Sequence, residues 1–179
     1  MAIGQGYVLV TPLQLAMAYC GIATGKIMKP HILKEVKNPV GDVVAKFEPE
    51  EISTPDVDPA LLGIIQDALH GVATEGKSVS PIIKQYGIDC AVKTGTAEVA
   101  GKNDFAWTVA YGPYTKPKYV CAVIIEEGGG GAAVATPVAA QVLKAAMESA
   151  EGKLKDDVQF VPGSTGRSVK ISATSQRTD

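Results

Sequence analysis

The chain has 179 residues, enough for one domain with its own apolar core, and 46% hydrophobic with 20% charged residues is ordinary for a globular protein. Its formal net charge is −2 and it contains no basic cluster, so we expect no nucleic acid partner and no anionic membrane surface. No apolar run reaches the ~18 residues that span a bilayer, and residues 1–10 lack signal-peptide features, so we expect a soluble chain.

The N-terminal third is predicted to contain one helix and one hairpin. The helix would begin at Thr11-Pro12, because proline is favoured at the first helical position and Gln14 completes a capping box with Thr11. It should end by Gly25. Residues 31–47 then show two short β-branched runs around a turn rich in asparagine, proline and glycine, which predicts a β-hairpin.

A second helix, beginning with a capping aspartate and Pro59, runs into a motif that suggests nucleotide binding. Residues 71–78, GVATEGKS, match the Gly-x-x-x-x-Gly-Lys-Ser pattern of phosphate-binding loops. Such a loop needs a strand before it and a helix after it. Here a helix is predicted to end near Gly71, and Pro81 is expected to leave no helix start after the motif. We therefore interpret the match as accidental.

Three consecutive strands are predicted within residues 89–126, with the sequences DCAVKTGTAEV, FAWTVAY and KYVCAVIIEE. The connections between them, AGKND and GPYTKPK, are short enough to force an antiparallel meander. Apolar residues lie on both faces of 119–125, so both sides of that strand should be covered. A third helix, predicted from Thr136-Pro137 to about Met147, would cover one side.

Two further features are candidates for a binding site. The run Gly128–Gly131 could be a phosphate-binding nest, but we interpret it as a flexible connection between strand and helix. The three cysteines, Cys20, Cys90 and Cys121, lie far apart without Cys-x-x-Cys spacing. They are predicted to be buried apolar residues rather than a metal site or a disulfide framework, and we expect no cofactor.

Together these elements predict an α+β fold, in which an antiparallel sheet is flanked by helices. Residues 1–148 would form the domain, and the polar, aperiodic residues 149–179 would form a mobile tail. His31 and His70 have no accompanying acid in a recognisable motif, so neither is predicted to be catalytic. Trp107 and Tyr111 share a strand face, which we interpret as core packing.

The stretch AVKTGTAE places Lys93, Thr94, Gly95 and Thr96 on a strand just before a turn. Alternation directs Thr94 and Thr96 to one face and Lys93 to the other, and Gly95 lets a ligand backbone approach the strand edge. Two hydroxyls, a lysine and open backbone groups would suit a peptide carboxylate. The alternative is an exposed edge strand that keeps these residues for solubility.

These residues lie in a wider pattern. KTGTAE, together with IGQGYVLVTPLQLAMAYCGIATGKIMKPHIL, FAWTVAYGP and YVCAVIIEEGGGGAAVATPVAAQVLKA, resembles the C-terminal part of the transpeptidase domain of class B penicillin-binding proteins, from about Ile3 to Met147. Lys-Thr-Gly is one of that family's signatures. The resemblance implies the penicillin-binding protein/β-lactamase-like fold. It also implies a serine acyltransferase that cross-links peptidoglycan stem peptides outside the cytoplasmic membrane, to which the parent would be anchored, and that is acylated by β-lactams.

The resemblance also implies roles for the four residues. Lys93 would lie near the nucleophile and support proton transfer. The hydroxyls of Thr94 and Thr96 would hold the terminal carboxylate of a stem peptide or a β-lactam. The backbone N–H of Thr96 would be one of two oxyanion-hole donors, and Gly95 would permit the close approach of the substrate. No metal is implied.

The sequence departs from the family in two motifs. None of its serines is followed three residues later by lysine, and neither asparagine has serine two positions before it, so Ser-x-x-Lys and Ser-x-Asn are absent. We expect the chain to be inactive alone and to need the upstream half of the domain as its partner. It could be an expressed piece, a truncated gene product or one part of a two-piece enzyme, and its exposed apolar surface should favour self-association.

Two other functions stay open. A non-catalytic module of the same fold would bind peptides or a protein partner without forming an adduct. A serine β-lactamase or β-lactam sensor uses the same Lys-Thr-Gly strand, although the GQG and TPLQ segments favour the transpeptidase.

Overall fold

The computed structural model of the chain describes residues 4–150 and 152. At its centre is an antiparallel sheet in the order β5-β6-β7, formed by Ala91–Ala97, Phe105–Gly112 and Tyr119–Ile125. Short connections join these strands, so each pairs with the next along the chain. The predicted meander is confirmed, and with it the α+β fold.

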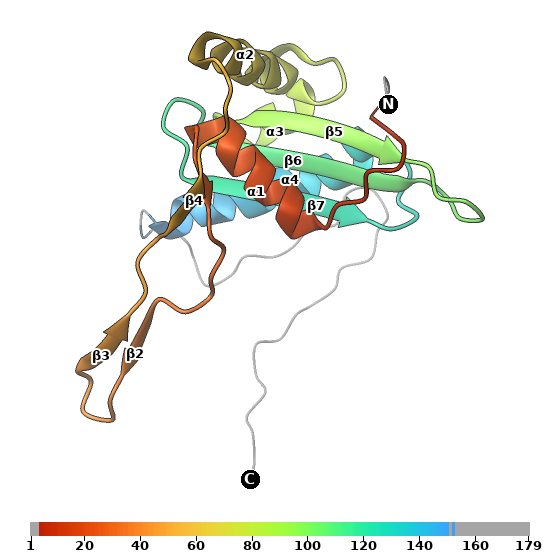
Figure 1. Cartoon of the computed structure of the whole chain (residues 1–179). Helices are drawn as coiled ribbons and strands as arrows, with labels where there is room; N and C mark the ends of the chain where they lie inside the picture. The colour runs from red at the N-terminus through yellow and green to blue at the C-terminus, as the bar shows by residue number, and fades with distance from the viewer. Residues whose placement is uncertain (1–3, 151, 153–179) are drawn as a thin grey trace.

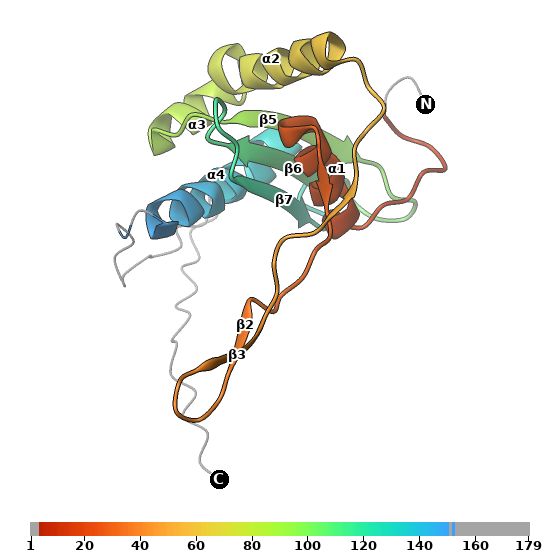
Figure 2. The same ribbon diagram turned by 60° about the vertical axis from the view of Figure 1, so that its left-hand side comes forward.

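Two helices cover opposite faces of this sheet (Figures 1 and 2). Helix α1, Pro12–Thr24, lies across β6 and β7, and helix α4, Gly131–Ala150, runs behind all three strands. The strand β7 therefore contacts a helix on each side, as its apolar residues on both faces predicted.

The ends of α1 are set by local sequence. The hydroxyl of Thr11 accepts from the N–H of Gln14 at 3.2 Å, and the Gln14 side chain accepts from the N–H of Thr11 at 2.9 Å. Gly25 adopts a left-handed φ of 73° and donates its N–H to the carbonyl of Gly21. The predicted capping box and glycine stop are both confirmed.

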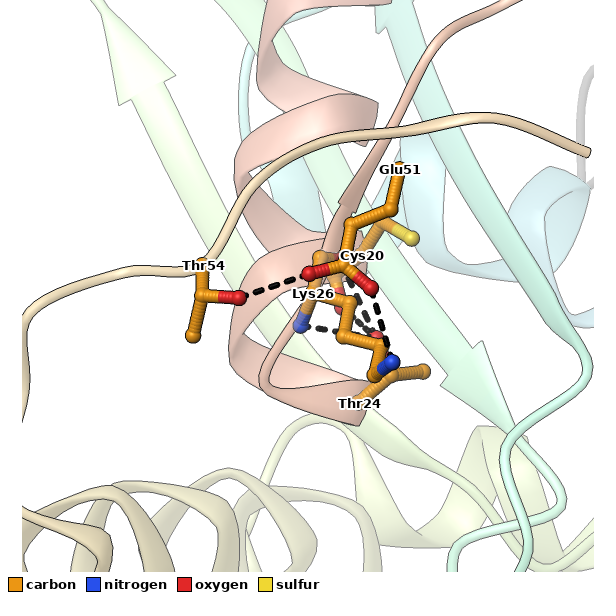
Figure 3. Close-up of polar contacts among 5 residues, drawn as sticks. All are labelled: Cys20, Thr24, Lys26, Glu51 and Thr54. Carbon is orange, nitrogen blue, oxygen red and sulfur yellow. Dashed lines mark hydrogen bonds and ion pairs between the residues drawn. The ribbon is translucent and has the colours of Figure 1, made fainter.

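A pair of two short strands, β1 (Ile27–Met28) and β4 (Glu51–Ser53), follows α1. The ammonium of Lys26 lies 2.7 Å from the carboxylate of Glu51, which also accepts from the hydroxyl of Thr54 (Figure 3). Hydrogen bonds from Lys26 and Thr54 lower the pKa of Glu51. These contacts tie the end of α1 to the returning strand.

The predicted hairpin is formed by β2 (Glu35–Lys37) and β3 (Val43–Lys46), and it projects away from the rest of the molecule (Figure 1). The Asn38 side chain organises its turn, because its amide oxygen accepts from the N–H groups of Val40 and Asp42.

The segment with the nucleotide-binding pattern is helical on both sides. Helix α2, Pro59–Glu75, continues through Gly71, and a short helix α3, Ser80–Tyr86, follows the motif. The expectation that Pro81 prevents a helix was wrong, because proline at the first helical positions loses no hydrogen bond. No strand enters the motif, and the Gly76 N–H already donates to carbonyls of α2. A phosphate-binding loop is therefore not formed here.

Helix α4 begins six residues earlier than Thr136-Pro137 predicted, and it ends at Ala150 rather than near Met147. Thr136 is fully buried and Pro137 lies inside the helix, so this Thr-Pro pair is not a helix start. The helix starts instead at Gly131, which packs closely on the sheet: an added Cβ there would lie 2.3 Å from the carbonyl oxygen of Gly95. The predicted domain boundary at 148 falls within α4, and of the predicted tail, residues 149–179, all but 149, 150 and 152 lie outside the described residues.

Apolar cores lie on both sides of the sheet. One fills the space between the sheet, α3 and α4, and the other lies between the sheet, α1 and α2. Cys90 is buried in the first, and this burial, with Asp89 nearby, raises the pKa of its thiol to about 12. Cys20 and Cys121 are only half-buried free thiols, so the prediction of buried cysteines is correct for Cys90 alone. Across residues 4–150, each helix is too short or too polar to cross a bilayer.

Candidate active site

A pocket of about 480 Å³ lies over the C-terminal half of β5. Its wall combines the N-terminal segment, the inner side of α1 and the strands β5 and β6: Gly4, Gln5, Val8–Val10, Leu15, Tyr19, Lys93–Ala97, Trp107 and Val109. All four predicted site residues are in this set. Lys93 is the one charged side chain in the described lining, and Gln5 and Tyr19 are the polar side chains that line the pocket outside β5.

The four residues of β5 all line the pocket, although their side chains point to alternate faces of the strand. Within the described part of the chain, β5 pairs with β6 and leaves its other edge open. Residues directly opposite each other share a face, and Lys93 lies opposite Val109 while Gly95 lies opposite Trp107. Thr94 pairs instead with the buried Thr108 on the α4 side. The predicted alternation is therefore confirmed.

Lys93 and Gly95 have different relations to the fold. The Lys93 ammonium donates to the carbonyl oxygen of Thr94 at 2.6 Å and remains exposed. A Cβ added to Gly95 would meet only the Cβ of Trp107, at 3.5 Å, which is an ordinary contact. The fold itself would tolerate a small side chain at position 95. Glycine there leaves free space on the pocket side of the strand.

A contact that the sequence analysis missed joins the N-terminal segment to the end of β5. The N–H of Glu98 donates to the side-chain oxygen of Gln5 at 2.8 Å, although the two residues are 93 positions apart. This bond ties the N-terminal segment, which lines the pocket, to the residue that directly follows β5. The only signal was the GQG segment within the family resemblance, since no local pattern links such distant residues.

The two aromatic residues of β6 separate into different roles. Tyr111 is 1% exposed and belongs to the core, where burial raises the pKa of its hydroxyl to about 12. Trp107 is half-buried and lines the pocket. Core packing is therefore confirmed for Tyr111, whereas Trp107 is only partly buried and borders the pocket. Tyr19 is the second aromatic residue that lines the pocket, and its burial raises the pKa of its hydroxyl.

One histidine has an acid partner that the sequence analysis did not find. Nε2 of His70 lies 2.9 Å from the carboxylate of Asp89, and its ring stacks on Tyr114 with centroids 4.0 Å apart. No sequence motif revealed this acid, because it lies 19 residues away and only the fold joins the two side chains. His31 instead contacts the carbonyl of Leu33. Neither histidine lines the pocket, and His70 ties α2 to the start of β5.

This arrangement can receive an anion, but its described lining holds no serine or cysteine that could act as the nucleophile. A lysine, two hydroxyls and the open edge of β5 are brought together. Within residues 4–150 and 152, no three histidine, cysteine, aspartate or glutamate side chains gather in a way that could hold a metal ion. The geometry therefore favours recognition of a carboxylate and of an extended backbone along β5.

Comparisons with known proteins agree with this chemistry. The family model described as penicillin binding protein transpeptidase domain matches residues 1–144. The peptidoglycan D,D-transpeptidase MrdA of Haemophilus influenzae is 32% identical over 163 residues, covering 80% of this chain and 24% of that protein. The Salmonella typhimurium MrdA is 29% identical, with 80% of this chain and 26% of that protein covered. The chain therefore spans about a quarter of the length of these curated relatives.

Solved structures give the same result. The D,D-transpeptidase domain of a peptidoglycan glycosyltransferase from Eggerthella lenta superposes with a TM-score of 0.68 at 33% identity, covering 81% of this chain and 33% of that chain. The imipenem acyl-enzyme complex of penicillin-binding protein A from M. tuberculosis gives 0.67 at 28% identity, with 81% and 33% covered. The chain thus belongs to the penicillin-binding protein transpeptidase domain family, and it corresponds to part of such a domain in a class B protein.

Proposed function

We propose that this chain supplies the substrate-binding strand of a serine-type peptidoglycan D,D-transpeptidase that β-lactams acylate. The observation that carries the proposal is the placement of Lys93, Thr94, Gly95 and Thr96 together along the open edge of β5 in the pocket. Relatives with D,D-transpeptidase in their names, and a relative solved as an imipenem acyl-enzyme, support this choice of chemistry.

Each residue has a role in this proposal. A stem peptide lies antiparallel along β5, and its terminal carboxylate binds the hydroxyls of Thr94 and Thr96 beside the positive charge of Lys93. The N–H of Thr96 points to the oxygen that becomes negative in the tetrahedral intermediate, where one such donor contributes about 10²–10³-fold in rate. Lys93 supports proton transfer to and from the nucleophile.

The nucleophile, its base and the second oxyanion donor come from outside this chain. Ser-x-x-Lys and Ser-x-Asn are absent from its sequence, and acylation needs these groups within hydrogen-bond reach of Lys93 and Thr96. We propose that the remaining part of a transpeptidase domain binds over the pocket and the apolar residues of the N-terminal segment. The complete protein would be anchored in the cytoplasmic membrane with this domain outside, where peptidoglycan is cross-linked.

The test is the intact mass after incubation with benzylpenicillin, for this chain alone and for the chain with any residues that precede it in its gene. We expect no adduct on the chain alone and one adduct, on a serine outside this chain, for the longer protein. An adduct on a serine of this chain would contradict the proposed division of roles. Gly63→Ala, at a helical position where an added Cβ meets nothing within 4 Å, serves as the folded control.

A non-catalytic peptide-binding module is the second candidate, and the missing Ser-x-x-Lys motif favours it. That function predicts saturable, reversible binding of D-Ala-D-Ala peptides without any covalent adduct in either protein. For either candidate function, Gly95→Val tests ligand binding separately from folding. Its side chain would extend toward the space that a ligand backbone needs. Loss of peptide binding with an unchanged melting temperature is the expected result.

A further inference from the structure

We infer that the first turns of α4 position the Lys-Thr-Gly strand from behind, with Gly131, Thr136 and Thr108 as positioning residues for the Thr96 N–H. The three lie on the face of the sheet opposite the pocket, and none of them lines it. The catalytic consequence rests on the function proposed above, whereas the mechanical link between α4 and β5 can be tested without it.

Gly131 is in close contact with the backbone of β5 and β6. A Cβ built there would lie 2.3 Å from the carbonyl oxygen of Gly95, 2.4 Å from that of Trp107 and 3.1 Å from the nitrogen of Gly95. No side chain fits at such distances, since even about 3 Å to backbone requires one element to move. Glycine at position 131 therefore lets α4 begin directly against the strand.

The contacted oxygen belongs to the peptide group that carries the proposed oxyanion donor. The carbonyl of Gly95 and the N–H of Thr96 form one rigid planar unit, and in a trans peptide they point in opposite directions. The cis bond among the described residues is Gly112-Pro113, so this unit is trans. A displacement of the Gly95 oxygen must therefore re-orient the Thr96 N–H on the other side of the strand.

A small buried network holds Gly131 in place. The hydroxyls of Thr108 and Thr136 each lie 3.3 Å from the carbonyl oxygen of Gly131 and 3.0 Å from each other. Both threonines are fully buried, and Thr108 is the β6 residue directly opposite Thr94. Valine would fill the same volume without the cost of burying a hydroxyl, so the two hydroxyls are best explained by the carbonyl that they fix.

The glycine run supplies a matched control. Gly130 adjoins Gly131, but a Cβ added to it would meet nothing within 4 Å. Gly130→Ala and Gly131→Ala therefore make the same chemical change one residue apart, and only the second pushes on β5.

The first measurement is the backbone amide NMR spectrum of this chain. We expect Gly131→Ala to shift the amide signals of Gly95 and Thr96 and Gly130→Ala to leave them in place. Unchanged signals in a folded Gly131→Ala protein would overturn the inference, whatever the protein does with β-lactams. Failure of the wild-type protein to be acylated would instead refute the proposed function and leave the NMR result intact.

The second measurement separates positioning from general stability. In the longer protein that acylates, Gly131→Ala should lower the rate constant of the acylation step at least tenfold, with a smaller change in the initial binding constant of penicillin. Equal loss in Gly130→Ala, or an unchanged acylation step, would contradict the inference.

A gentler variant is available because Gly131→Ala could fail to fold. Thr136→Val keeps the volume and removes the hydroxyl, whereas Thr136→Ser keeps the hydroxyl. We expect Thr136→Val to shift the Thr96 amide and slow acylation, and Thr136→Ser to restore both. Identical behaviour of the valine and serine variants would show that the hydroxyl does not position the strand.

Discussion

The two faces of the β5-β6-β7 sheet differ in how completely this chain covers them. On the α4 face, Ala139, Ala140 and Leu143 are fully buried. On the side of α1, α2 and the N-terminal segment, large apolar side chains remain in solvent, including Leu9 at 91%, Leu13 at 56% and Ile64 at 64% exposure. The first face is complete in itself, whereas the second has the apolar surface that a protein partner would bury.

Because of this difference, the candidate site on β5 lies between a fully covered face of the sheet and an incompletely covered one. Thr94 pairs with a residue of the covered face, while Lys93 and Gly95 face the incomplete one. The covered face therefore packs against the strand from one side, and the other face leaves Lys93 and Gly95 exposed. Substitutions on each face and a rise in pH sharpen the comparison, in order of their expected effect on the free energy of unfolding.

The largest loss is expected for Leu143→Ala on the covered face. Leu143 is fully buried in α4, and removing a buried leucine side chain costs about 2–5 kcal/mol. The matched variant Leu61→Ala changes a side chain that is 57% exposed, so it should cost less than about 0.5 kcal/mol. Urea denaturation of both proteins measures the difference. Similar losses would mean that the two sides are equally packed.

Alkaline pH should produce an intermediate loss. Burial raises the pKa of Cys90 and of Tyr111 to about 12, so both stay protonated in the folded protein at pH values where the unfolded chain ionises. Their contribution is complete below the ordinary thiol pKa and is lost as pH rises toward about 12, by at most about 1.4 kcal/mol per pH unit for each group.

Cys90→Val separates the two groups, because it removes the thiol titration from the covered face and leaves Tyr111 in place. We expect its unfolding free energy to fall less steeply than that of the wild type between about pH 9 and 11. Equal slopes in urea denaturation would show that Cys90 does not retain its proton on folding.

The smallest effect on unfolding, but a clear effect on association, is expected for Ile64→Lys. Because Ile64 is 64% exposed on α2, the substitution should change the free energy of unfolding by less than about 0.5 kcal/mol. The exposed apolar surface should make the wild-type chain self-associate, and a lysine there should weaken this. Sedimentation at several concentrations measures both proteins, and a wild type that stays monomeric with no dye-binding surface would refute the expectation.

Local signals predicted much of the fold. The start of α1 was predictable from four consecutive residues, which include Thr11, Pro12 and Gln14. The short connections between the strands were enough to predict the meander. The same cap-plus-proline signal was misleading at Thr136-Pro137, because Thr136 is buried in the core and the helix already starts at Gly131, which packs closely on the sheet. When a residue packs against a distant part of the chain, its neighbouring sequence does not reveal that contact.

The candidate site divides in the same way. Period-two alternation was enough to assign Lys93 to one face of β5 and Thr94 to the other. The rest of the pocket wall could not be predicted, because it depends on contacts between residues far apart in the sequence. Gln5 binds Glu98 across almost a hundred residues, and Trp107 shares a face with Gly95 because β6 pairs with β5. The acid beside His70 was missed for the same reason.

The order of elements along the chain also has a consequence for chain entropy. The strands β5 to β7 and helix α4 follow one another directly, so only short loops must close to assemble them. Helix α1 packs on β7 although most of the chain lies between them, and its contacts must offset a longer closure. We therefore expect α1 to detach locally before the meander opens, which amide hydrogen exchange would detect as faster exchange in α1 than in β6.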